Sequence, residues 1–170
     1  MVFVLLWQNA GPRVSFSNAG VLRTADAVAA IIVLDDSLYV LQRRDNVPGI
    51  WYPDHWGCFG GGVNQGEAPL AALRRELREE LEWEPRTAAY FTRLDFDLSE
   101  LGLGRYHRIY YTVPMARADL TKLVVHEGQG FAAFPAAEAL ATLRIAPYDA
   151  FALFLYHARY RIAAQAEQAR

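Results

Sequence analysis

The sequence predicts an α+β fold in which helices pack against a mixed β-sheet. Two patterns favour this class: strand-like segments precede and follow one strong helix, and a second, amphipathic helix closes the chain. The composition, 53% hydrophobic and 21% charged, is that of a globular protein with ample core material. For 170 residues we expect one domain over residues 1–170, with residues 1–24 as an N-terminal extension.

Four strands are expected before the first helix. Val2–Trp7 and Arg13–Ser17 have the character of two short strands within the extension. Ala27–Leu34 is a continuous apolar run with the length of a buried strand. A polar turn follows it, so Leu38–Arg43 is expected to pair with this run as a hairpin.

A long segment rich in Pro, Gly and aromatic residues, Arg44–Gly62, separates the hairpin from the helix. A loop of this length in a compact domain is usually functional or disordered, and its bulky aromatics argue against disorder. We expect it to form one wall of a cleft, with aromatics that either stack on a flat ligand or pack in the core or as a lid. The candidate substrate contacts here are Arg43, Arg44, Trp51, Tyr52, His55 and Trp56.

The second half of the chain alternates between strands and helices. Two long strands, Thr87–Leu98 and Arg105–Pro114, are expected on either side of a glycine-containing turn, and a short strand is expected at Lys122–His126. Helices are expected at Pro135–Ala141 and Tyr148–Ala166. The core candidates on the last helix are Phe151, Leu155 and Ile162.

The helix expected at Pro69–Leu81 has two distinct flanks. At about 100° per residue, its leucines form one apolar stripe. Glu76, Glu79 and Glu80 fall together on one flank, where like charges at this spacing repel one another. A hard divalent cation with oxygen ligands is the natural compensation, and a solvated Glu-rich face is the alternative.

The global composition excludes several classes of protein. Seventeen basic and nineteen acidic residues give a net charge of −2, which is unsuited to gripping a long nucleic acid. The apolar runs are far shorter than the roughly 18 residues that a membrane span needs, so no membrane partner is expected. The single cysteine, Cys58, can form neither an internal disulfide nor a Cys-based zinc site alone, and a cytoplasmic location is the default expectation.

The spacing Gly61-x5-Glu67-x7-Arg75-Glu76-Leu77-x-Glu79-Glu80 resembles the signature of the Nudix hydrolase (MutT-like) superfamily. Members of that superfamily cleave nucleoside diphosphates linked to another moiety. The resemblance implies a Nudix-type fold, a mixed β-sheet between helices with a catalytic loop-helix-loop that binds Mg²⁺ or Mn²⁺. It also implies a small nucleotide-type diphosphate as substrate and allows a homodimer.

The resemblance also assigns roles within the signature. Glu79 and Glu80 are expected as first metal ligands, Glu76 as a further ligand or base, and Glu67 as a residue that acts through water or holds the loop. Arg75 is expected to orient Glu67 or Glu76. The catalytic set is thus Glu76, Glu79, Glu127 and Arg75, the metal set is Glu67, Glu76, Glu79 and Glu80, and Gly61 and Gly62 lie against substrate.

Glu127 enters this set because His126-Glu127-Gly128 follows the late strand. Several family members place a metal-binding or basic Glu in this downstream region. Glu127 is therefore expected to be either a general base or an ordinary surface carboxylate, with His126 as its neighbour.

One position departs from the family pattern: Glu82 stands where the signature has a glycine. On the helical wheel Glu82 lies between Arg75 and Arg78, away from the metal flank, so no ligand is lost. An Arg78–Glu82 pair at i,i+4 is expected there.

The function that follows is a Mg²⁺-dependent pyrophosphohydrolase in which water attacks phosphorus with the assistance of the metal. A catalytically inactive Nudix-fold nucleotide sensor is one alternative, but the four signature carboxylates are all present. An isopentenyl-diphosphate-type isomerase, which uses a cysteine, is the other. The position of Cys58 beside the glycine loop does not match that branch.

Overall fold

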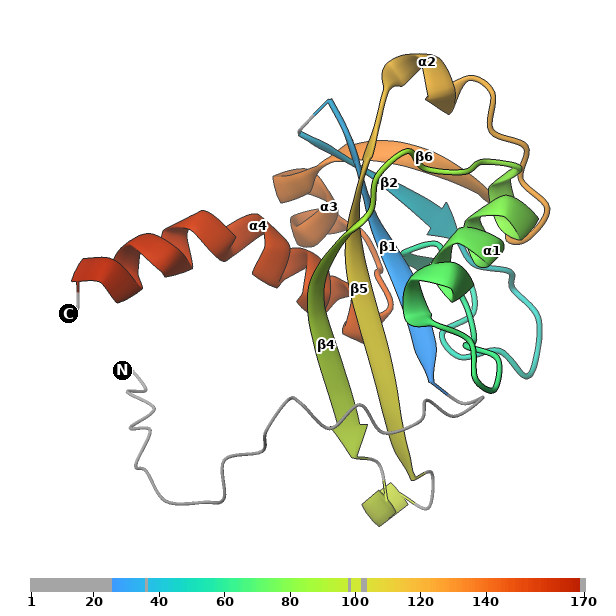
Figure 1. The fold of residues 1–170 in the computed structure, drawn as a ribbon, viewed down its shortest axis with the longest axis horizontal. Helices are drawn as coiled ribbons and strands as arrows, with labels where there is room; N and C mark the ends of the chain where they lie inside the picture. The colour runs from blue at the N-terminus through green and yellow to red at the C-terminus, as the bar shows by residue number, and fades with distance from the viewer. Residues whose placement is uncertain (1–25, 36, 98, 102–103, 169–170) are drawn as a thin grey trace.

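A six-stranded mixed β-sheet forms the centre of the computed structural model, which describes residues 26–35, 37–97, 99–101 and 104–168 (Figure 1). The strands are β1 (Ala27–Leu34), β2 (Leu38–Arg43), β3 (Trp56–Gly57), β4 (Ala89–Asp97), β5 (Arg105–Met115) and β6 (Gly130–Pro135). The helices are α1 (Pro69–Leu81), α2 (Arg117–Leu120), α3 (Ala136–Thr142) and α4 (Pro147–Gln168). The strands expected at Val2–Trp7 and Arg13–Ser17, and the whole expected extension, lie outside the described residues.

The strand order is β3-β2-β1-β5-β4, and β6 pairs with the other side of the hairpin strand β2. β1 and β2 form the expected antiparallel hairpin, whereas β1 and β5 run parallel. β1 is therefore an interior strand, which explains its continuous apolar sequence. The mixed sheet of the predicted α+β class is confirmed.

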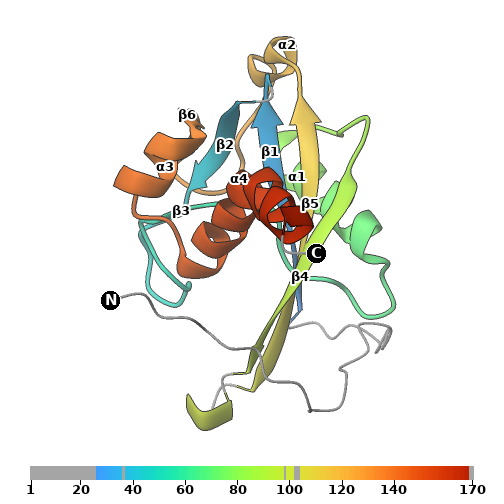
Figure 2. The ribbon, with the colours of Figure 1, turned by 90° about the vertical axis from the view of Figure 1, so that its left-hand side faces the viewer.

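Alternate residues of β1 enter two separate cores, one on each face of the sheet. Val28, Ala30 and other residues of the first set pack with the leucines of α1. Ala29, Ile31 and other residues of the second set pack with α3 and α4. The sheet is thus covered by α1 on one face and by α3 and α4 on the other (Figure 2).

Four short elements were not expected from the sequence, namely β3, α2, β6 and a 3-10 helix at Ser99–Leu101, and one expected strand is wrong. β3 and α2 are too short to have a clear periodicity, and β6 begins after the predicted strand Lys122–His126 has ended. Residues 123–126 form no strand, since the N–H groups of Val124 and His126 donate to the carbonyls of Leu81 (3.2 Å) and Glu80 (2.9 Å). These bonds satisfy two carbonyls at the end of α1, which otherwise lack a helical partner.

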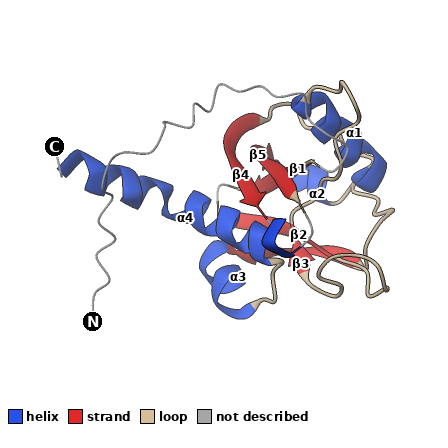
Figure 3. Ribbon diagram, turned by 90° about the horizontal axis from the view of Figure 1, so that it is seen from below, coloured by secondary structure: helices blue, strands red, loops and turns tan. Residues whose placement is uncertain are grey.

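The core face of α4 also differs from the prediction. Phe151 and Ile162 are exposed, whereas Ala152 and Leu153 are fully buried. The helix crosses the sheet only with its first part and then extends beyond it (Figure 3). A periodic pattern therefore identified the helix but not which residues meet the sheet. No helix in the described ranges combines the length and apolar character that a membrane crossing requires.

Candidate active site

Helix α1 places its glutamates along the edge of the buried leucine stripe. Leu73, Leu77 and Leu81 are fully buried against β1. Glu80 is only 5% exposed and Glu79 is largely exposed, so neighbouring carboxylates on one helix have different environments. This ordering follows from the angle of each residue to the apolar stripe.

The glycine segment before α1 runs antiparallel to β1 and touches these carboxylates. Backbone bonds join Val28 N–H to Gly61 O (2.9 Å) and Ala30 N–H to Phe59 O (2.8 Å). A Cβ at Gly60 would lie 2.3 Å from Val28 O, and one at Gly61 would lie 2.5 Å from Glu76 Oε2. Only glycine permits this approach of the segment to both the strand and the helix.

Glu80 is the most deeply buried carboxylate of α1. Its Oε2 accepts a hydrogen bond from Gly60 N–H at 3.0 Å. Burial raises the pKa of Glu80 to about 8, and the charges of Glu127 and Glu76 add to this shift. Burial also raises the pKa of Glu76. Carboxylates held together in this way favour either a proton or a cation.

Arg75 ties the other carboxylates of the signature together. Its guanidinium donates to Glu67 (2.9 and 3.0 Å), Glu76 (2.7 Å) and Glu79 (3.2 Å), and also to the carbonyl of Gly62 at 2.9 Å. The hydrogen bonds from Arg75 and then Asn64 lower the pKa of Glu67 to about 2. Glu67 is thereby held ionised at the entrance of α1 while Arg75 spans the glycine segment and the helix.

The departure from the family signature lies at the end of α1. Glu82 adopts a left-handed conformation, with φ of 50°, as the C-terminal cap of the helix. This conformation explains why the signature carries glycine here. The expected Arg78–Glu82 pair is wrong, because the chain leaves the helical direction at Glu82. Arg78 instead pairs with Glu84 (3.1 Å), and Glu82 Oε1 lies 2.7 Å from His126 Nε2.

The loop that carries Glu127 is joined to both the end of α1 and β2. His126 N–H donates to Glu80 O, and Gln42 Nε2 donates to the carbonyl of Glu127 at 2.9 Å. A Cβ at Gly128 would lie 2.7 Å from Arg43 O, so glycine permits close packing of the loop. Glu127 itself is exposed and raises the pKa of both Glu76 and Glu80, which indicates that it faces the same cluster.

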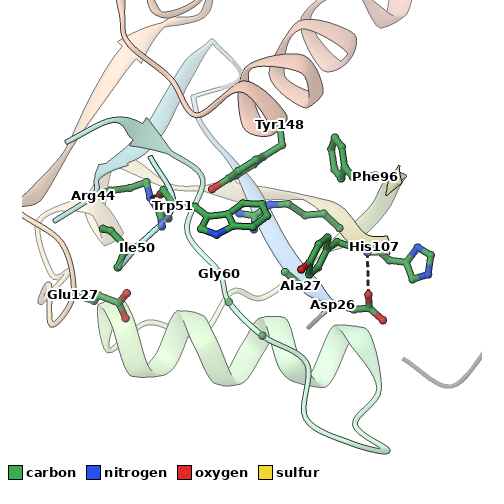
Figure 4. A pocket seen from close by; sticks show the side chains of 14 residues that line it. Asp26, Ala27, Arg44, Ile50, Trp51, Gly60, Phe96, His107, Glu127 and Tyr148 are labelled. Carbon is green, nitrogen blue, oxygen red and sulfur yellow. Dashed lines mark hydrogen bonds between the residues drawn. The ribbon is translucent and has the colours of Figure 1, made fainter. Parts of the chain in front are cut away.

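A pocket of about 410 Å³ opens beside the glycine segment (Figure 4). Gly60, Gly61 and Gly62 line one side, and Glu127 lies at one end of it in Figure 4, opposite Asp26 and His107. Its remaining walls come from the start of β1, the loop after β2, β4 and β5, and the start of α4. They comprise Ala27, Arg44, Ile50, Trp51, Phe96, Tyr106, Arg108 and Tyr148. Its volume is in the range of small-molecule sites.

The residues predicted to contact substrate are divided between this pocket and other places. Arg44 and Trp51 line the pocket, and Tyr52 lies in an adjoining aromatic recess. Arg43 forms an ion pair with Asp54 at 2.9 Å, and Trp56 packs against Phe134 in the core on the α3 and α4 side. His55 Nδ1 lies 2.8 Å from the carbonyl of Pro53. We therefore leave Arg43, Trp56 and His55 out of the proposed site.

Several pocket residues were not anticipated from the sequence. Arg108 and Tyr106 come from β5, Phe96 from β4 and Tyr148 from α4. Each belongs to a segment whose local pattern predicts only a strand or a helix, so no sequence signal marks it. Their common role emerges only where β4, β5 and α4 meet.

Cys58 is fully buried on the face of the sheet opposite α1. Burial raises the pKa of its thiol well above the ordinary value, with a further contribution from Asp149. A thiol in this environment stays protonated and does not line the pocket beside the glycine segment.

The donor atoms of this region suit a hard divalent cation. Glu76, Glu79 and Glu80 supply carboxylate oxygens, the ligand type that Mg²⁺ and Mn²⁺ prefer, and burial, with a smaller contribution from neighbouring carboxylates, raises the pKa of Glu76 and Glu80. Within the described ranges, no three Asp, Glu, His or Cys side chains converge as a preformed metal site. Arg75 partly explains why the carboxylates do not converge on one point, because Glu67, Glu76 and Glu79 all turn toward its guanidinium.

The model of the NUDIX domain family matches residues 23–154 of the chain. The chain belongs to this family. The matched range contains the glycine segment, α1 and Glu127, as well as the β4, β5 and α4 residues of the pocket. The predictions of a Nudix family member and of a Nudix-type α+β fold are confirmed.

Among curated relatives, the nucleoside triphosphatase NudI of Escherichia coli O139:H28 (strain E24377A / ETEC) is 42% identical over 50 residues. This match covers 29% of this chain and 35% of the relative, so the chain spans about a third of the length of that Nudix protein. The short match supports the family rather than a particular substrate.

Several solved structures share the fold. The E. coli ORF135 protein is 29% identical with a TM-score of 0.64, covering 81% of this chain and 91% of that one. The E. coli dihydroneopterin triphosphate pyrophosphohydrolase is 20% identical with a TM-score of 0.61, covering 78% and 94%. The NUDIX domain of Shewanella oneidensis NrtR, solved with ADP ribose, is 17% identical with a TM-score of 0.64, covering 86% and 94%. The last two likenesses concern the fold alone.

Proposed function

We propose that this Nudix protein is a divalent-metal-dependent hydrolase that cleaves a phosphoric anhydride bond in a nucleoside diphosphate derivative or nucleoside triphosphate. The observation that carries the proposal is the contact between the glycine segment and the buried carboxylates, directly beside the 410 Å³ pocket. Arginines and aromatic side chains in the same pocket suit the phosphate and base of a nucleotide. The NudI likeness agrees with this substrate class.

Glu76, Glu79 and Glu80 are the residues that would hold Mg²⁺ or Mn²⁺, with Glu67 as a further carboxylate held by Arg75. A bound divalent cation would neutralise charge on the diphosphate and lower the pKa of a bound water. Gly60 N–H orients Glu80, and Arg75 orients Glu67 and Glu76, so the carboxylates are preorganised. Glu127, exposed at the pocket, is the side chain that we assign as proton acceptor for the attacking water.

The two other candidate activities fit these observations less well. An inactive nucleotide sensor would not need three signature carboxylates ordered around Arg75 and a fourth, Glu80, held by Gly60 N–H. An allylic diphosphate isomerase would need an accessible cysteine at the pocket, and Cys58 is buried on the other face of the sheet. The hydrolase is therefore the function that the geometry supports best.

A substrate panel with Mg²⁺ tests the proposal. Nucleoside triphosphates, nucleoside diphosphate sugars and dinucleoside polyphosphates are incubated with the protein, and phosphate and pyrophosphate release are measured. We expect turnover of at least one class, loss of turnover in excess chelator, and recovery on adding Mg²⁺ or Mn²⁺. Tight nucleotide binding without turnover would support the sensor instead, and isomerised allylic diphosphate would support the isomerase.

A further inference from the structure

Asp149 is a fully buried carboxylate behind the pocket, with no part in the carboxylate cluster of α1. It lies in the first turn of α4 and accepts three hydrogen bonds. The donors are Cys58 N–H (2.9 Å), the Tyr110 hydroxyl (2.9 Å) and Arg108 Nε (3.2 Å). Burial, followed by the charge of Asp149, raises the pKa of Tyr110, so this hydroxyl remains a donor.

The neighbouring backbone is shaped around Asp149. A Cβ at Gly57 would lie 2.8 Å from Asp149 Oδ2, so the absence of a side chain in β3 makes room for the carboxylate. A charge removed from water in this way is strongly unfavourable unless it is paired and hydrogen-bonded. The partner that supplies the opposite charge is Arg108.

Arg108 connects this buried carboxylate to the pocket. Its side chain is 15% exposed, and the residue lines the pocket wall. The guanidinium lies 4.6 Å from the centre of the Tyr148 ring, and Asp149 holds its Nε side. One edge of the group is thus fixed by the protein, while an arginine offers further N–H donors beyond Nε.

The surroundings of Arg108 are aromatic. Trp51 and Tyr106 pack edge to face at 5.6 Å, and Phe96 packs against Tyr148 at 6.5 Å, all four lining both the main pocket and the adjoining recess. Flat heterocycles stack favourably on such rings. The two carboxylates that line the pocket, Asp26 and Glu127, lie near its opposite ends (Figure 4).

We propose that Arg108, positioned by Asp149, reads the nucleobase and favours bases with two adjacent hydrogen-bond acceptors. Guanine presents such a pair at O6 and N7, and cytosine presents one at O2 and N3. In adenine the N6 amino group lies beside both N7 and N1, so a donor stands next to each of these acceptors and opposes a guanidinium. This inference deepens the proposed function, on which it rests, by naming the class of base.

Calorimetric titration of the whole protein with GMP, CMP, AMP and UMP tests the assignment, because the phosphate is the same in all four ligands. We expect the wild type to bind GMP or CMP at least about tenfold more tightly than AMP. The GMP and CMP arms decide which acceptor pair is read. Arg108→Gln should bring the four dissociation constants within about twofold of one another while AMP affinity changes little.

Arg159→Gln is the matched control. Arg159 also stacks on a tyrosine, at 3.7 Å from the Tyr156 ring on α4, but it is not a pocket residue. It should keep the full preference. Absence of any preference in the wild type, or equal weakening of all four nucleotides by Arg108→Gln, would overturn the proposal, the latter by identifying Arg108 as a phosphate contact.

The positioning role of Asp149 is tested by the ratio of GMP or CMP affinity to AMP affinity. A general loss of structure would weaken all nucleotides together and leave this ratio unchanged. Asp149→Asn should lower the GMP or CMP preference toward that of Arg108→Gln. Tyr110→Phe, which removes one donor from Asp149 and leaves Arg108 intact, should lower it partly, even if Asp149→Asn does not fold. Unchanged preference in Tyr110→Phe and in a folded Asp149→Asn would exclude the positioning role.

A parallel hydrolysis assay with GTP, CTP and ATP separates this inference from the proposed function. Base preference in binding without any hydrolysis would sink the proposed hydrolase and leave Arg108 as the base-reading residue. Hydrolysis with no base preference would support the hydrolase and overturn the base-reading role of Arg108.

Discussion

Gly61 lies against the carboxylate of Glu76 so closely that a Cβ at this glycine would approach Glu76 Oε2 to 2.5 Å. The Glu76 carboxylate therefore fills the space that a side chain at position 61 would need. The backbone carbonyl of Gly61 also accepts a hydrogen bond from Val28 N–H of β1. The signature spacing thus couples the sheet, the loop and the helix at the point where the carboxylates gather.

Gly61→Ala should displace the Glu76 side chain and lower kcat by about 10²-fold, because a shift of about 1 Å at a reacting centre has effects of that size. Steady-state kinetics with Mg²⁺ measures the change, and thermal unfolding reports the fold. Gly104→Ala is the control, since a Cβ at Gly104 would meet no atom within 4 Å, although Gly104, unlike Gly61, has a positive φ. It should lower stability slightly and leave kcat intact. Wild-type kcat in Gly61→Ala would show that the position of Glu76 is unimportant.

Glu80→Gln should stabilise the metal-free protein at alkaline pH while abolishing activity. Burial raises the pKa of Glu80 to about 8, so its contribution to stability is present below the unfolded pKa near 4.5 and is lost as pH rises through 8. Glutamine keeps an acceptor for Gly60 N–H without the charge. The gain should be on the order of 1–3 kcal/mol at pH 9 and much smaller at pH 5.

Chemical denaturation in chelator at pH 5, 7 and 9 measures this gain. Glu79→Gln is the matched control, because Glu79 is 60% exposed and its charge stays in water. Added Mg²⁺ should stabilise the wild type but not Glu80→Gln, because only the wild type gains binding energy on folding. Equal stability of Glu80→Gln and wild type at pH 9 would contradict the assigned burial effect.

Glu127→Gln should lower kcat by about 10²–10⁴-fold, the usual contribution of a general base, and reduce Mg²⁺ affinity much less than Glu80→Gln does. Glu127 lies on a separate loop that lines the pocket, and its charge raises the pKa of Glu80 in the carboxylate cluster. Kinetics and metal titration are compared with Glu138→Gln, an exposed carboxylate on α3. If Glu127→Gln instead turns over within about twofold of the wild type, the base must come from α1.

Glu82→Gly should leave turnover within about twofold of the wild type. Glycine relieves the left-handed backbone strain of Glu82, worth about 1 kcal/mol, whereas the exposed contact with His126 is worth about 0–1 kcal/mol. Glu82→Ala removes the same carboxylate but keeps the strain, so thermal unfolding of the two variants separates the effects. A large loss of kcat in both would indicate that the His126 contact holds the Glu127 loop in place.

Much of the fold was predictable because its signals are local. The apolar run of β1, its hairpin partner β2 and the leucine period of α1 each predict an element from neighbouring residues. The strand expected at Lys122–His126 was wrong because its N–H groups bond to the end of α1 instead of a sheet neighbour. Hydrogen bonds between residues distant in sequence produce no periodic pattern in the local sequence, so they cannot be predicted from it.

The candidate site likewise contains residues that local sequence predicts and residues that only long-range packing brings together. The sequence alone determined that Glu76, Glu79 and Glu80 share one flank of a helix and that glycines precede it, because helical geometry converts spacing directly into direction. Only the tertiary structure decided that Arg108 and Tyr148 line the pocket and that Asp149 lies buried behind Arg108. These residues meet through the parallel pairing of β1 with β5 and the packing of α4 on the sheet, and long-range packing depends on the whole chain rather than on any one segment.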